Sequence, residues 1–175
     1  MSAPEFSRPV RIDTLAPKAK AMSIGAKEDE RAALAKRFNL QAIDHLSAEI
    51  DLSRNGDHVT AAGTLSAKVT QSCVASGEPV EEQVDEEFRI DFLPQPADIA
   101  AEDEIELSSA ELDIVFYEGT SIDIGEAMAE TLSLSIEPYP RSPNAAEALK
   151  QAGVKNEEEA GAFGALAALR DKLKG

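Results

Sequence analysis

Residues 46–69, LSAEIDLSRNGDHVTAAGTLSAKV, decide the fold of this chain. Apolar residues occupy every second position from residue 46 to 52, and a second alternating run extends from residue 59 to 69. A period of two is typical of strands that bury one face and leave the other in water. Between the runs, Asn55-Gly56 can supply the two positive φ angles of a type I′ turn. The stretch therefore predicts a β-hairpin.

Three further segments are predicted to join this hairpin in one sheet. Apolar side chains alternate from Val84 to Phe92, and a shorter run covers residues 112–116. Residues 5–13 also have an extended pattern, and Pro9 favours an edge position because proline cannot donate to a strand ladder. These runs predict a mostly antiparallel β-sheet of about five strands.

Helical patterns flank the strands. Residues 27–38 are rich in helix formers, and a second helix is predicted to begin at Asp123, with Glu126 in the first turn, and to end before Pro138. Two short helical patterns follow, at 145–152 and 156–173. The fold class predicted is α+β, with flanking helices and a helical C-terminal tail. We expect one domain over residues 1–143, with a mobile acidic loop at about 94–109, and a tail over 144–175 that docks on it.

The charged residues are distributed unevenly along the 175-residue chain. The formal net charge is −16, and residues 38–137 alone carry 23 acids against three bases. Such a field repels phosphate backbones and attracts basic proteins. We predict partner binding by five acids of the third strand, with a purely solubilising face as the alternative: Glu81, Glu82, Asp85, Glu86 and Glu87. The N-terminal segment is basic, and possible RNA contacts there are Arg8, Arg11, Lys36 and Arg37.

No motif of a known catalytic or cofactor site is present. The chain lacks the glycine-rich nucleotide-binding patterns, and its only cysteine, Cys73, cannot form an internal disulfide. His45 and His58 precede and open strands, so they could share an edge, and a hydrolase or metal enzyme that uses them with Cys73 is the alternative of a different class. We favour a non-enzymatic protein with no cofactor, and expect Cys73 to be a structural thiol without a basic neighbour to lower its pKa.

The segment from Met1 lacks a signal peptide core, and no apolar stretch is long enough to cross a membrane. We therefore predict a cytoplasmic protein that contacts no membrane. Because no motif of a known catalytic or cofactor site is present, we also expect no small-molecule substrate.

Several motifs, taken in order, resemble the YceD-like large ribosomal RNA subunit accumulation proteins, above all their α-proteobacterial branch. The resemblance begins at Cys73-Val-Ala-Ser-Gly-Glu-Pro-Val and continues through the acidic strand that ends in Phe-Arg-Ile-Asp-Phe92, a long acidic loop, and Ser121-Ile-Asp-Ile-Gly-Glu. It ends in Pro138-Tyr-Pro-Arg-Ser-Pro-Asn and the tail from Phe163. The residues that carry the similarity include Cys73, Gly77, Glu78, Pro79, Gly125, Glu126, Pro138 and Pro140.

The resemblance implies a non-enzymatic factor for the accumulation of 23S ribosomal RNA and the biogenesis of the large ribosomal subunit. Many members have Cys-x-x-Cys where this chain has Cys73-Val-Ala-Ser76, and further cysteines near the proline segment, where this chain has none. We therefore predict no metal site. The acidity favours a basic ribosomal or assembly protein as the partner and disfavours direct 23S RNA contact by the sheet. The alternative is an acidic adaptor for another basic protein unrelated to ribosomes.

Overall fold

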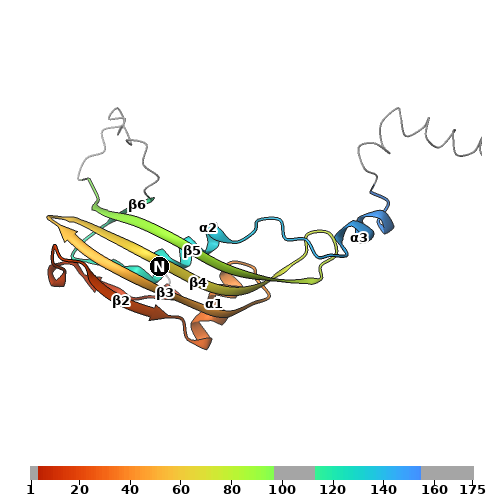
Figure 1. The fold of residues 1–175 in the computed structure, drawn as a ribbon, viewed down its shortest axis with the longest axis horizontal. Helices are drawn as coiled ribbons and strands as arrows, with labels where there is room; N and C mark the ends of the chain where they lie inside the picture. The colour runs from red at the N-terminus through yellow and green to blue at the C-terminus, as the bar shows by residue number, and fades with distance from the viewer. Residues whose placement is uncertain (1–3, 97–112, 155–175) are drawn as a thin grey trace, which may run out of the picture. The chain divides into compact units, whose positions relative to one another are not determined.

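The computed structural model describes residues 4–96 and 113–154 (Figure 1). Its β-strands and helices confirm the α+β class, with a mainly antiparallel sheet of five strands. The elements in chain order are β1 (Pro9–Arg11), a 3-10 turn (Ile12–Thr14), β2 (Lys20–Gly25), α1 (Glu28–Arg37), β3 (Ala42–Asn55), β4 (His58–Ser72), β5 (Pro79–Pro94), β6 (Asp113–Tyr117), β7 (Ser121–Asp123), α2 (Ile124–Ser135) and α3 (Ala145–Gln151).

The large sheet has the strand order β2-β3-β4-β5-β6, and Figure 1 shows its long strands lying side by side. β3 is antiparallel to both β2 and β4, whereas β6 runs parallel to β5. The N-terminal segment was predicted to form an edge of this sheet, and that prediction is wrong. β1 pairs with β7 in a separate two-stranded sheet, and the edge is taken by β2, whose six residues have too few apolar positions to stand out in the sequence.

The predicted hairpin is confirmed, but its turn type is not. Asn55 pairs with His58, so the two-residue loop is Gly56-Asp57. Gly56 has φ of 63°, and neither Asn55 nor Asp57 has a positive φ. A glycine with positive φ at the first of the two loop positions is the pattern of a type II′ turn. The turn thus lies one residue further along the chain than Asn-Gly suggested.

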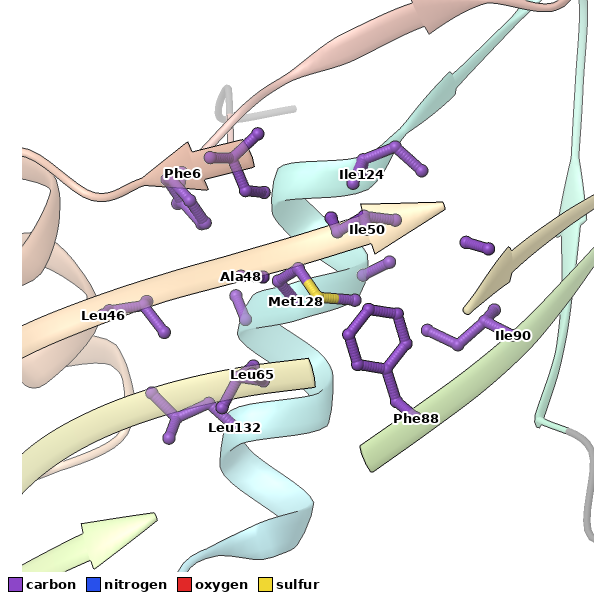
Figure 2. Packing of buried hydrophobic residues seen from close by; sticks show 14 of the residues in the cluster. Phe6, Leu46, Ala48, Ile50, Leu65, Phe88, Ile90, Ile124, Met128 and Leu132 are labelled. Atoms are coloured by element: carbon purple, nitrogen blue, oxygen red, sulfur yellow. The ribbon is translucent and has the colours of Figure 1, made fainter. Parts of the chain in front are cut away.

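Helix α2 covers the inner face of the sheet. Ile124, Met128 and Leu132 are fully buried. Figure 2 shows them among side chains of β3, β4 and β5, including Leu46, Leu65 and Phe88. Gly125 permits the N-terminal segment to pass close to the start of α2, because a Cβ atom there would lie 2.3 Å from the carbonyl oxygen of Phe6. As predicted, Asp123 caps the helix, and its side chain accepts a hydrogen bond of 3.2 Å from the Glu126 amide.

The chain divides into two units. Unit 1 comprises residues 1–70 and 81–136, and unit 2 comprises residues 71–80 and 137–175. Within unit 2, α3 matches one of the two predicted short helices, although the Asn144 side chain forms no capping hydrogen bond. The helix predicted at 156–173, the docking of the tail and most of the predicted acidic loop lie outside the described residues. Over the described ranges, no helix is long and apolar enough to span a bilayer.

Candidate functional site

The outer face of the sheet in unit 1 carries a row of exposed carboxylates. Side chains on this face have the opposite parity to the buried residues of each strand. We call this surface the outer acidic face, and it comprises five residues of β3 and β5: Glu49, Asp51, Glu81, Asp85 and Glu87. Between them, β4 contributes mostly small or hydroxylated side chains to the same face, together with Lys68 and, at the start of the strand, His58. The acids are therefore not screened by bulky neighbours.

Among the described residues of β4 and β5, two cationic side chains share this face with the acids, Lys68 and Arg89. The Lys68 ammonium lies 3.1 Å from the Glu81 carboxylate. The Ser23 hydroxyl donates to Glu49 at 2.6 Å, and the Ser66 hydroxyl donates to Asp85 at 2.8 Å. A hydroxyl donor orients a carboxylate but leaves its charge in place. Most of the negative charge on the face thus remains available to a partner.

The structure separates the five acids that were predicted to bind a partner. Glu81, Asp85 and Glu87 lie on the outer acidic face, whereas Glu82 and Glu86 have the parity of the buried Val84 and Phe88. β5 is one continuous strand, so successive side chains point to alternate faces of the sheet. Sequence reasoning missed Glu49 and Asp51 because they are well separated in the sequence from the acidic cluster. The alternation of the first run places Glu49 and Asp51 between inward residues, and this pattern could have shown that they lie on the outer face.

Three of the four residues predicted to contact RNA form ion pairs within the chain. Arg8 makes two hydrogen bonds to Glu30, at 2.7 and 2.8 Å, and lowers the pKa of that carboxyl to about 2. Arg37 binds Glu126 at 2.7 Å and Glu5 at 3.1 Å, and both contacts raise its pKa. Arg11 pairs with Asp13. Among residues 4–96 and 113–154, no carboxylate forms an ion pair with Lys36. These arginines therefore hold the N-terminal segment and α1 in place.

The two histidines do not share an edge. His45 lies opposite Lys68 and His58 lies opposite Asn55, so they are ten positions apart along β3, or roughly 33 Å. His58 instead approaches Asp91, with Nε2 at 3.0 Å from a carboxylate oxygen that also accepts the Thr60 hydroxyl at 2.7 Å. The predicted common edge is wrong because the β3–β4 register places the histidines at opposite ends of the hairpin.

Unit 2 contains a tight turn around Cys73. The Gly77 amide donates to the Cys73 carbonyl at 2.9 Å, and Gly77 has φ of 74°. The Ser76 amide donates to the Cys73 sulfur at 3.4 Å. The Ser142 hydroxyl donates to Glu78 at 2.7 Å and lies 3.1 Å from that of Ser76. We call these residues the Cys73 turn: Cys73, Ser76, Gly77, Glu78 and Ser142.

The thiol in this turn is buried, as predicted, but it is more acidic than the sequence indicated. Cys73 is 3% exposed. The backbone amide of Ser142, followed by hydrogen bonds from Ser76, lowers the pKa of Cys73 to about 6. Hydrogen bonds from Ser142, Asn144 and Ser76 also lower the pKa of Glu78. The expectation of an unperturbed thiol rested on the lack of a basic neighbour, whereas amide and hydroxyl donors produce the shift.

Among the described ranges, no group of three or more histidine, cysteine or acidic side chains is arranged to hold a metal ion. The Cys73 turn offers one thiol, two hydroxyls and one carboxylate, and the hydroxyls are already committed to each other and to Glu78.

The sequence profile described as large ribosomal RNA subunit accumulation protein YceD matches residues 61–170, which is more than half of the chain. The chain belongs to the YceD family. No curated protein and no solved structure matched it. The range that matches the YceD profile begins within β4, and it includes the Cys73 turn and the β5 part of the outer acidic face. The elements β2 and α1 and the acids of β3 precede this range. That the chain belongs to the α-proteobacterial branch of this family stays a prediction.

Proposed function

We propose that this protein is a non-enzymatic factor that supports accumulation of 23S ribosomal RNA and biogenesis of the large ribosomal subunit, by binding a basic protein partner on the outer acidic face. Membership of the YceD family supports the ribosomal part. The single observation that carries the partner-binding part is the row of exposed carboxylates with only Lys68 paired to it among the described residues.

Electrostatics favours a basic protein over RNA on this surface. Affinity for RNA grows as lysine and arginine side chains neutralise phosphates and release counterions, and a face of carboxylates does the opposite. A basic ribosomal or assembly protein would gain association rate from the same field, most strongly at low salt. The arginines of the N-terminal segment are paired with Glu30, Glu126 and Asp13, so they add little to an RNA surface.

Deletion of the gene tests the ribosomal role. We expect sucrose-gradient sedimentation of extracts from the deletion strain to show fewer large subunits relative to small ones, with the ratio restored by the wild-type gene. A normal ratio of subunits would contradict the ribosomal function and favour an adaptor for an unrelated basic protein.

Two pairs of substitutions on β5 then test the face. Asp85→Asn/Glu87→Gln removes two charges from the outer acidic face. Glu82→Gln/Glu86→Gln removes two charges from the same strand at positions of the opposite parity. We expect the first pair to fail to restore the ratio of subunits in the deletion strain and the second to restore it. Both proteins should be as stable as wild type, because removing like charges reduces self-repulsion. Equal restoration by both pairs would leave solubility as the role of these acids.

A further inference from the structure

The free edge of the large sheet lies next to the outer acidic face. β2 is the first strand in the order β2-β3-β4-β5-β6, and it pairs with β3 alone (Figure 1). Its exposed residues Ala21, Ser23 and Gly25 lie opposite Asp51, Glu49 and Ser47 in turn. The edge and two of the acids therefore form one continuous surface within unit 1.

The register shows which main-chain groups of β2 point away from the sheet. The Ala26 amide donates to the Leu46 carbonyl at 3.0 Å, so this pair is hydrogen-bonded. Hydrogen-bonded and non-hydrogen-bonded pairs alternate along an antiparallel ladder, so Met22 and Ile24 also face β3. The amide and carbonyl groups of Ala21 and Ser23, and the amide of Gly25, then point outward. Arg8 confirms the parity, because its guanidinium donates to the Gly25 carbonyl at 3.0 Å from the outer side.

Arg8 covers the Gly25 carbonyl at one end of this edge, but from Ala21 to Ser23 the edge lacks the devices that usually prevent a strand from pairing with another chain. Free edges in natural proteins are commonly blocked by proline, a bulge or a charged side chain. The register of β2 with β3 is unbroken, and residues 21–25 contain neither proline nor charge. Lys20 begins the strand, but it has the parity of Met22 and Ile24 and so does not neutralise the acids of the outer face.

We propose, resting on the function proposed above, that a basic partner adds an extended segment to the open edge of β2. Its main chain would pair with the outward groups of Ala21 and Ser23, and lysine or arginine side chains at alternate positions would reach Glu49 and Asp51. Strand addition of this kind takes its affinity from main-chain hydrogen bonds and its specificity from alternate side chains. A second copy of this chain is a poorer occupant, because each copy carries a net charge of −16.

A proline substitution can block this edge without breaking the sheet. Ser23→Pro removes an amide that points outward, so it removes no hydrogen bond of the β2–β3 ladder. Ser23→Ala is the matched control, because it deletes the hydroxyl that donates to Glu49 and leaves the amide in place. Circular dichroism and thermal unfolding of both variants report whether the fold is retained.

The probe is an alternating lysine-valine heptapeptide with a fluorescent label, and a glutamate-valine peptide is its control. By fluorescence anisotropy at low salt, we expect the basic peptide to bind the full-length wild type and Ser23→Ala within about twofold of each other, and Ser23→Pro at least about tenfold more weakly. The glutamate-valine peptide should not bind. Glu49→Gln/Asp51→Asn should weaken binding of the basic peptide and flatten its salt dependence. Unchanged binding to a folded Ser23→Pro would overturn the proposal.

Amide hydrogen exchange of the wild type keeps the test decisive if Ser23→Pro does not fold. Added lysine-valine peptide should slow exchange at Ala21, Ser23 and Gly25 and leave Met22 and Ile24 unchanged, whereas equal effects at both sets would contradict edge pairing. A free protein that sediments as a dimer, and becomes a monomer in Ser23→Pro, would assign the edge to a second copy instead. Restored subunits in a deletion strain that expresses Ser23→Pro would contradict edge docking and leave the ribosomal function standing.

Discussion

Unit 1 and unit 2 are each stabilised internally by a different kind of interaction. All members of the apolar cluster belong to unit 1, where α2 covers one face of the sheet. In the described part of unit 2, the buried apolar residues are Cys73, Pro140 and Ala145, and hydrogen bonds among Ser76, Glu78 and Ser142 connect its segments. Apolar burial scales with area and tolerates local change, whereas each hydrogen bond depends on two specific partners. Substitutions should therefore have large effects on stability in unit 1 and chemically specific effects in unit 2.

The largest effect is expected from the buried side of α2. Leu132 is fully buried, whereas Leu134 on the same helix is 80% exposed. We expect Leu132→Ala to lower the free energy of unfolding by about 2–5 kcal/mol and Leu134→Ala to change it by less than about 0.5 kcal/mol. Urea denaturation followed by circular dichroism measures both. Similar losses from the two substitutions would mean that α2 does not form the core as described.

A smaller loss is expected where two strands of unit 1 approach closely. A Cβ atom on Gly63 would lie 1.9 Å from the carbonyl oxygen of Glu49, so the β3 backbone would have to move. We expect Gly63→Ala to lower the free energy of unfolding by about 1–3 kcal/mol. The adjacent exposed Thr64→Ala serves as the control in the same urea titration. A stability equal to wild type would show that β3 and β4 can separate without cost.

The β3–β4 turn should respond to the shape of the substituted residue. Gly56 has φ of 63° and open space around its Cα. Gly56→Val should cost about 1–2 kcal/mol because a β-branched residue resists positive φ, and Gly56→Asn should cost less. Thermal unfolding compares the two. Full thermal stability of Gly56→Val would contradict the turn geometry, which sets the register that separates the inner face from the outer acidic face.

Unit 2 should show a pH dependence that unit 1 does not share. Hydrogen bonds in the folded state, first from the Ser142 backbone amide, lower the pKa of Cys73 to about 6, so the thiolate favours the folded state. This contribution is complete above pH 9, decreases as the pH falls, and is lost below about pH 6. The pH dependence of the unfolding free energy should therefore be flatter in Cys73→Ser between pH 6 and 9.

Thiolate absorbance near 240 nm, taken as the difference from Cys73→Ser, gives the midpoint directly. We expect about pH 6 in the wild type and a higher midpoint in Ser142→Ala, which loses the hydroxyl contribution but keeps the backbone amide. A midpoint near the ordinary cysteine value, about 8.5, would show that the amides do not hold the thiolate.

Sequence patterns predicted the long elements and two short ones, β6 and α3, but they missed β2 and β7 and placed the segment that contains β1 in the wrong sheet. The alternating runs of β3, β4 and β5 and the capped start of α2 were recognisable because many residues repeat one pattern. β1 and β7 have three residues each and β2 has six, so few positions carry a pattern and their pairing is decided by distant segments. The acids of β5 were predicted as one partner-binding cluster, although alternation in the sequence already gives Glu86 the parity of Phe88 and Asp85 the opposite one. The sequence suggested that the start of this strand projects or bulges, whereas the structure has one continuous strand.

The sequence alone determined the hairpin, the helix that follows Asp123, the negative charge of the central region and the resemblance to the YceD family, because each depends on residues close in the chain or on their order. Tertiary structure decided which strand occupies the free edge, which acids share a face and which donors surround Cys73. These features join residues far apart in sequence: Ser23 meets Glu49, and Ser142 meets Glu78. Such contacts arise from strand pairing and chain reversal, which no local pattern specifies.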